Sequence, residues 1–134
     1  MVYDLIKITK GNLIGRVYDI NQSRDFVGYC NIDAEEIYLD ASYMKYVEPI
    51  PLTEEILKAN GFEYEKRPEN CMVFEKETDD IDIIIAHYQD TPNKFFTNIE
   101  ANETEIRKDI LTVHELQHAL RICGLNELAN NFKV

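Results

Sequence analysis

The stretch Val113-His114-Glu115-Leu116-Gln117-His118-Ala119-Leu120 decides how the C-terminal half of this chain is interpreted. Apolar residues recur at intervals of three or four from Ile110 through this stretch to Cys123. That spacing places them on one face of a helix, so we predict a helix over about residues 109–123 that ends at Gly124 and docks its apolar face onto the domain. The same letters match H-E-x-x-H, the signature of zinc hydrolases, which is the competing interpretation.

In the zinc interpretation, His114 and His118 lie one helical turn apart and bind the metal, and Glu115 is the general base on the metal-bound water. The letters HELQHAL resemble those of zinc metallopeptidases. A catalytic zinc also needs a third protein ligand. Those enzymes supply the third ligand downstream of the second histidine. The downstream candidate here is Glu127, only nine residues on and close to the end of the sequence. The remaining histidine, His87, lies upstream, which is the wrong order for those enzymes.

We therefore predict that the two histidines are a pair on the flank of a docking helix. On this prediction no residue is catalytic, and neither a metal nor another cofactor is bound. A minimal zinc hydrolase with Glu115 as its base and His114 and His118 as ligands stays the alternative.

Outward from this stretch, residues 62–134 predict an antiparallel sheet. Strands are expected at residues 62–66, 71–76, 81–88, 94–99 and 104–107, with turns between them. Residues 62–66 alternate apolar and charged side chains, which predicts one buried and one exposed face. Residues 81–88 are the most apolar and are expected at the centre. The predicted helix covers this sheet, and a short helical turn follows at residues 125–131.

Residues 49–61 predict a connector. Pro49 and Pro51 favour an extended chain. Thr53 is expected to cap a short helix whose first turn carries two glutamates, where the helix dipole favours negative charge. The helix should end at Asn60-Gly61, with one of these residues in the left-handed conformation.

Residues 1–48 predict a small β-rich subdomain. Short runs rich in β-branched and aromatic residues occupy residues 13–20, 25–30, 36–40 and 43–47, the first of them after a Lys10-Gly11-Asn12 turn. Several short strands joined by tight turns are typical of a small SH3-like barrel. The whole chain is thus expected to be α+β: an SH3-like, barrel-type N-terminal half, then an antiparallel sheet covered by a C-terminal helix.

The chain carries 25 acidic and 14 basic residues, a net charge of −11. Nucleic-acid binding needs a basic patch, and no basic cluster exceeds the pairs Lys66-Arg67 and Arg107-Lys108, so a nucleic-acid partner is disfavoured. The longest purely apolar run, Ile83-Ile84-Ile85-Ala86, is too short to span a bilayer. Three widely spaced cysteines form no C-x-x-C pair, so we expect reduced thiols and a cytoplasmic location.

Several short motifs follow one another in a characteristic order. They are Lys10-Gly11-Asn12, then Pro49-Ile50-Pro51-Leu52-Thr53-Glu54-Glu55-Ile56-Leu57 with Asn60-Gly61-Phe62, then Val113-His114-Glu115-Leu116-Gln117 with Leu120 and Gly124. In this order they resemble a group of small uncharacterised proteins of Bacteroidetes phages, prophages and mobile elements. The pattern of that group is I-G-N, then I-P-L-T-E-E-W-L…G-F, then V-H-[EQ]-L-Q-N-L-Y-F-A-L-T-G-E-E-L.

The resemblance bears on the zinc interpretation. In that pattern the position of Glu115 takes Glu or Gln and the position of His118 is usually Asn, which implies that neither residue is a base or a ligand. The chain departs from the pattern at Ile56, where the pattern has Trp, and at residues 121–123. The resemblance implies an origin in a phage or mobile element and carries no biochemical function.

The sequence thus predicts a soluble, acidic, non-enzymatic module that binds an unknown protein partner and no membrane, in an oligomeric state that it does not specify. A weaker alternative is an acidic mimic of nucleic acid that inhibits a basic host protein, since an acidic surface suits a basic partner.

Overall fold

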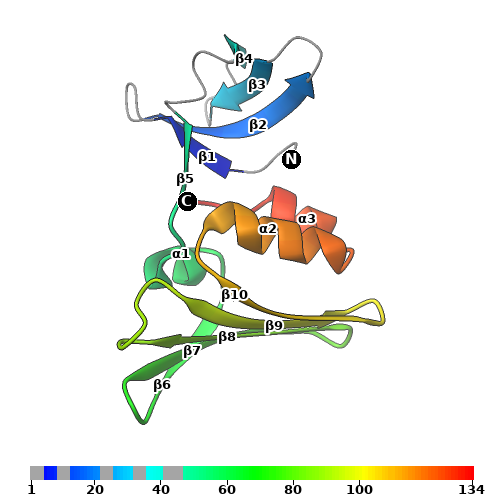
Figure 1. The fold of residues 1–134 in the computed structure, drawn as a ribbon. Helices are drawn as coiled ribbons and strands as arrows, with labels where there is room; N and C mark the ends of the chain where they lie inside the picture. The colour runs from blue at the N-terminus through cyan, green and yellow to red at the C-terminus, as the bar shows by residue number, and fades with distance from the viewer. Residues whose placement is uncertain (1–4, 9–12, 22–25, 32–35, 41–46) are drawn as a thin grey trace. The chain divides into compact units, whose positions relative to one another are not determined.

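The computed structural model of the chain describes the backbone of residues 5–8, 13–21, 26–31, 36–40 and 47–134, and the side chains from Glu48 onward (Figure 1). The chain divides into two compact units, Met1–Ile50 and Pro51–Val134. Each unit contains its own antiparallel sheet of five strands. Within the described residues, no helix is long and apolar enough to cross a membrane.

The first unit contains strands in the spatial order β4-β3-β2-β1-β5. Their bounds are β1 Leu5–Ile8, β2 Leu13–Asn21, β3 Phe26–Asn31, β4 Glu36–Asp40 and β5 Val47–Pro49. The turn predicted at residues 10–12 and most of the strand predicted at residues 43–47 lie outside the described residues. The SH3-like barrel depends on them and stays a prediction.

The second unit is built from a short helix, five strands and two further helices. Their bounds are α1 Glu54–Ala59, β6 Glu63–Arg67, β7 Cys71–Glu77, β8 Ile81–Tyr88, β9 Phe95–Ala101, β10 Thr104–Ile110, α2 Val113–Ile122 and α3 Asn126–Asn130. The strands form an open meander in the order β10-β9-β8-β7-β6. The predicted antiparallel meander, with residues 81–88 at its centre, is therefore confirmed.

The helices lie over one face of this sheet, which we call the inner face (Figure 1). Alternate residues of each strand point to it, so Ile83 and Ile85 of β8 and Ile99 of β9 are fully buried. The apolar stripe predicted from the sequence is buried on this side: Val113, Leu116, Leu120 and Cys123 lie on α2 and its C-cap, and Ile110 lies at the end of β10. Each such aliphatic side chain stabilises the fold by roughly 1.5–3 kcal/mol when removed from water.

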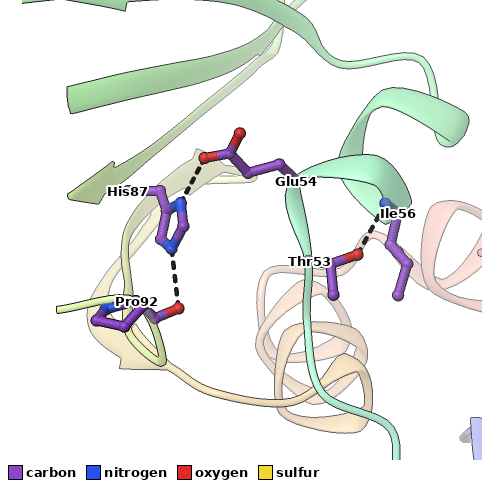
Figure 2. Close-up of polar contacts among 5 residues, drawn as sticks. All are labelled: Thr53, Glu54, Ile56, His87 and Pro92. Carbon is purple, nitrogen blue, oxygen red and sulfur yellow. Dashed lines mark hydrogen bonds and ion pairs between the residues drawn. The ribbon is translucent and has the colours of Figure 1, made fainter. Parts of the chain in front are cut away.

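α1 begins and ends as predicted. The side chain of Thr53 accepts a hydrogen bond from the backbone N–H of Ile56 at 3.2 Å (Figure 2). At the other end Gly61 takes the left-handed conformation, with φ of +81°. The N–H of Phe62 then reaches back to the carbonyl of Leu57 at 3.2 Å, which satisfies a carbonyl that the helix leaves free.

α2 ends in the same way, and a hairpin fastens its end. Gly124 has φ of +77°, and the N–H of Leu125 donates to the carbonyl of Leu120 at 2.9 Å. The two-residue turn between β9 and β10 is Asn102-Glu103, with positive φ at both positions, as in a type I′ hairpin. The side-chain amide of Asn102 donates to the carbonyl of Cys123 at 2.7 Å, so the hairpin also caps the helix.

The predicted start of the long helix is wrong by four residues. Residues 109 and 110 belong to β10, where Ile110 pairs with Phe95 of β9. The helix starts at Val113 because Thr112 is its N-cap, with extended backbone and a side chain that accepts from the N–H of Glu115. The apolar spacing places Ile110 in the predicted helix because this residue, at the end of β10, faces the core three positions before Val113.

The prediction that residues 62–66 are half buried is also wrong, since all five residues of β6 are exposed. β6 is an edge strand that pairs only with β7, so it lies at the margin of the helical cover. Tyr64 is 57% exposed; its ring lies 6.1 Å from that of Phe74, with the ammonium of Lys58 4.5 Å above its centre. Only Phe62, which precedes the strand, is buried.

Candidate functional site

The three residues of the zinc hypothesis lie in the first turns of α2. Thr112 Oγ1 accepts a hydrogen bond from the N–H of Glu115 at 3.4 Å and donates one to Glu115 Oε1 at 3.1 Å. It also lies 3.1 Å from His114 Nδ1. Glu115 therefore forms part of the helix cap, in the Thr-x-x-Glu spacing of a capping box.

This arrangement settles the tautomer of His114. The Thr112 hydroxyl has one proton, and its hydrogen bond to Glu115 uses that proton, so His114 Nδ1 must donate to Thr112. In the neutral imidazole this leaves Nε2 of His114 as the unprotonated nitrogen, which is the form that binds a metal. His118, one turn further on, is exposed. Two potential ligands are thus present on one side of α2.

A third ligand does not join them in the part of the chain that the structure describes. There, no group of three or more His, Cys, Asp or Glu side chains is arranged to hold a metal ion. Glu127, the downstream candidate, is an exposed residue in the first turn of α3. The minimal hydrolase thus remains a hypothesis without a third ligand among the described residues.

His87, the upstream histidine, has a different environment, which Figure 2 shows. Its Nδ1 lies 2.5 Å from Glu54 Oε2, and its Nε2 lies 2.9 Å from the carbonyl oxygen of Pro92. Its ring is stacked on that of Phe95, with centres 4.2 Å apart. Because a carbonyl only accepts, Nε2 carries a proton, and a second proton lies between Nδ1 and Glu54.

Both nitrogens of His87 are therefore occupied by the protein. The residue links the first turn of α1, strand β8 and the loop before β9, which is a structural role. Sequence reasoning missed this pair because Glu54 and His87 are 33 residues apart and no local pattern joins them.

The second candidate site is the other face of the β6–β10 sheet, which we call the outer face. Its centre is apolar and is formed by residues that point away from the helices. We call this set the apolar strip: Cys71 and Val73 of β7, Ile84, Ala86 and Tyr88 of β8, and Phe96 of β9. Ile84 is 36% exposed and Phe96 is 38% exposed. No helix of the second unit covers this face (Figure 1).

The members of the apolar strip are neighbours. Ala86 lies opposite Val73 on one side and Phe96 on the other. The rings of Tyr88 and Phe96 meet edge to face with centres 5.7 Å apart. A hydrogen bond with Cys71, the residue opposite Tyr88, raises the pKa of the tyrosine above its ordinary value of 10.0. The members of the strip are thus contiguous, with Ile84 and Phe96 exposed, Ala86 and Tyr88 half-buried, and Cys71 and Val73 buried.

Ile84 separates two shallow hollows in this surface. One, of about 540 Å³, is bordered by Phe96, Asn98 and Arg107. The other, of about 420 Å³, is bordered by Val73 and Tyr88. Among the described residues, Asn98 Oδ1 is the one buried side-chain oxygen or nitrogen without a hydrogen-bond partner.

Acidic side chains surround the apolar strip on the same face; we call them the acidic rim. They are Glu63 and Glu65 of β6, Glu75 and Glu77 of β7, Asp82 of β8, Glu100 of β9, and Glu105 and Asp109 of β10. The same face of the sheet also carries two guanidinium groups, those of Arg67 and Arg107. Arg67 lies within 3.5 Å of Glu65 and Glu75, and Arg107 lies 2.7 Å from Glu105.

Comparison of the chain with models of protein families, with curated proteins and with solved structures found no match in any of the three. The function is therefore inferred from the geometry of these two candidate sites.

The outer face is absent from the sequence-based prediction, although a signal for it exists. The run Ile83-Ile84-Ile85-Ala86 is apolar at consecutive positions, and consecutive residues of a strand point to opposite faces. Such a run predicts apolar side chains on both faces of the sheet. The helices of the unit cover only one of those faces (Figure 1). Which face they leave uncovered does not follow from the run itself.

Proposed function

We propose that the unit Pro51–Val134 is a non-enzymatic protein-interaction module that binds its partner through the outer face. The observation that carries this proposal is the apolar strip, which continues across β7, β8 and β9 and exposes Ile84 and Phe96 on a face that none of the unit's own helices covers. Scattered exposed apolar residues are ordinary, whereas a contiguous patch with a polar rim marks an interaction surface. The origin in a phage or mobile element is proposed on the sequence resemblance alone.

The edges of the sheet are less suited to binding than its face. β6 reads Glu-Tyr-Glu-Lys-Arg, and β10 contains Glu105, Arg107, Lys108 and Asp109. Charged side chains on an edge strand oppose the addition of a further strand from another chain. Pairing of a partner strand with this sheet is therefore not the proposed mode of binding.

A second copy of the chain is also a poor occupant of the outer face. Two copies face to face would bring one acidic rim against the other, and like charges across an interface are unfavourable. The proposal is therefore for a different protein, and it predicts that the isolated chain does not self-associate through this face.

The experiment compares two exposed isoleucines in the full chain. A photo-crosslinking residue is placed at Ile84 on the outer face or at Ile122 on α2, which is 56% exposed. Non-specific adhesion favours Ile122, the more exposed position, whereas the proposal expects a defined adduct from Ile84 only. The captured protein is then purified and its affinity measured.

We expect saturable binding of that purified protein, weakened by about tenfold or more in Ile84→Asp and unchanged in Ile122→Asp. Circular dichroism and thermal melting confirm that both variants are folded. Equal adducts from both positions, or an affinity that Ile84→Asp leaves unchanged, would rule out the outer face as the binding surface.

A further inference from the structure

We infer that the element that binds to the outer face is a basic amphipathic helix lying along β8, with its apolar side on the apolar strip and its Lys and Arg side chains directed at the acidic rim. This inference rests on the proposed function and adds to it the chemistry and shape of the partner. Two independent properties of the face lead to it, namely its dimensions and its charge.

The dimensions suit one helix. Ile84, Ala86 and Tyr88 follow one another along β8 and span about 13 Å, which is between two and three turns of helix. The strip spans three strands, from β7, where its members are buried, to β9, where Phe96 is exposed. This width of roughly 10 Å matches the diameter of one helix with its side chains. A helix with apolar residues at intervals of three and four therefore covers the strip.

The negative charge of the acidic rim favours a helix that carries Lys and Arg side chains. Within the described ranges, no Lys or Arg forms an ion pair with Glu63, Glu77, Asp82, Glu100 or Asp109, and the two arginines of the face are already paired. The rim borders the strip on both flanks, on β6 and on β10. It also borders one end of the strip, where Glu77, Asp82 and Glu100 lie side by side. A field of one sign around an apolar centre attracts cationic side chains and repels acidic ones.

Asn98 supplies a further polar contact for such a helix. It lies on the outer face opposite Ile84 and Arg107, and its Oδ1 accepts no hydrogen bond from the described residues. Lys and Arg are donors only, so a cationic side chain that enters beside Ile84 can satisfy this buried oxygen once the Asn98 amide turns toward it.

The test uses the full chain and a synthetic peptide of Leu and Lys whose leucines recur at intervals of three and four. We expect saturable binding in a one-to-one complex, with chemical-shift changes on the outer face of β7, β8 and β9. The affinity should fall as salt rises, because screening weakens the attraction to the rim. A peptide with Gln in place of every Lys should bind about tenfold more weakly.

Two charge variants locate the effect. Glu77→Lys/Glu100→Lys changes the rim, whereas Glu55→Lys/Glu127→Lys makes the same change of net charge on the helices. We expect the first variant to weaken peptide binding by about tenfold and the second to leave it nearly unchanged. Equal weakening by both would overturn the inference, because net charge alone would then explain the binding.

The outcomes separate this inference from the proposed function. If the crosslinked partner contacts Ile84 but contains no basic helix at the contact, or if the Gln peptide binds as tightly as the Lys peptide, the inference fails and the module remains. If no partner depends on Ile84, the proposed function fails as well. Peptide shifts confined to α2 and α3 would also overturn the inference, since the helix side would then be the basic-peptide surface.

Discussion

The hydroxyl of Thr112 accepts a hydrogen bond from the backbone N–H of Glu115 and donates one to the carboxylate of the same residue, 3.1 Å away. This pair closes the first turn of α2. In the H-E-x-x-H interpretation Glu115 would be a general base, whereas here its carboxylate is held at the helix N-terminus. A capping box accepts Glu or Gln at this position.

The cap predicts how substitutions of the two residues affect stability. Thr112→Ala should lower the free energy of unfolding by about 1 kcal/mol, since it removes the acceptor for the Glu115 N–H. Glu115→Gln should change it by only a few tenths of a kcal/mol, because the Gln side-chain oxygen can still accept from the Thr112 hydroxyl. Urea unfolding followed by circular dichroism measures both values. A Glu115→Gln variant as unstable as Thr112→Ala would show that the negative charge, and not the box, matters.

The cap also shows what the sequence can and cannot specify. Thr53 is predictable as an N-cap because a proline-rich connector precedes it and two glutamates follow. Thr112 has the same Thr-x-x-Glu spacing, but Ile110 extends the apolar periodicity past it in the N-terminal direction. The capping residue predicts that the helix starts after Thr112, whereas the apolar periodicity predicts an earlier start. Ile110 belongs to a strand because it pairs with Phe95, fifteen positions earlier in the chain.

The sheet meander and the buried stripe of α2 were predictable because both follow from alternation and spacing within short segments. Two relationships between residues far apart in the sequence were not. The bond between Glu54 and His87 joins an α1 residue to a β8 residue, and the acidic rim collects carboxylates from five strands. Their proximity depends on strand order and register, which no single segment contains.

The two left-handed glycines make a matched pair for a test of backbone strain. A Cβ on Gly61 would lie 3.4 Å from the flexible end of Lys76, so Gly61→Ala should cost only the left-handed backbone, about 1–2 kcal/mol. A Cβ on Gly124 would lie 2.7 Å from Asn102 Nδ2, the atom that caps α2. Gly124→Ala should therefore cost about 1–3 kcal/mol more than Gly61→Ala.

Thermal and urea unfolding of the two variants measures this difference. The further variant Asn102→Ala separates the clash from the strain, since Gly124→Ala should be less damaging in a chain that already lacks the Asn102 amide. Equal costs for the two glycine substitutions, or costs of Gly124→Ala and Asn102→Ala that simply add, would contradict the predicted collision.

Cys123 should be a protected thiol in the folded protein. Burial at the C-cap of α2 raises its pKa above the ordinary value of 9.0, so the folded state holds the proton more tightly than the unfolded chain does. In a Cys30→Ser/Cys71→Ser chain, the remaining thiol should react with a disulfide reagent at pH 8 far more slowly than in urea, because the thiolate is the reactive form. A native rate equal to the rate in urea would contradict the burial.

The same shift fixes the sign of a pH effect on stability. The contribution of Cys123 is fully present below about pH 9, and it is lost as the pH rises from there through the folded pKa. Unfolding free energies measured between pH 8 and pH 10 should therefore fall more steeply with Cys123 present than in a Cys123→Ala chain, because Ala lacks the titrating group.

Zinc content decides between the two interpretations of α2. His114 and His118 offer two ligands, a catalytic zinc site takes three from the protein, and the described part of the chain supplies no third. We therefore expect purified protein to contain less than stoichiometric zinc and to melt at the same temperature with and without a chelator. His118→Asn should leave stability unchanged, because the residue is exposed. His87→Asn serves as the control and should cost about 1–3 kcal/mol, since it disturbs the hydrogen bonds to Glu54 and Pro92 and the stacking on Phe95. One zinc per chain that disappears in His118→Asn would reinstate the hydrolase, and Glu115 would then have to leave the helix cap to act as its base.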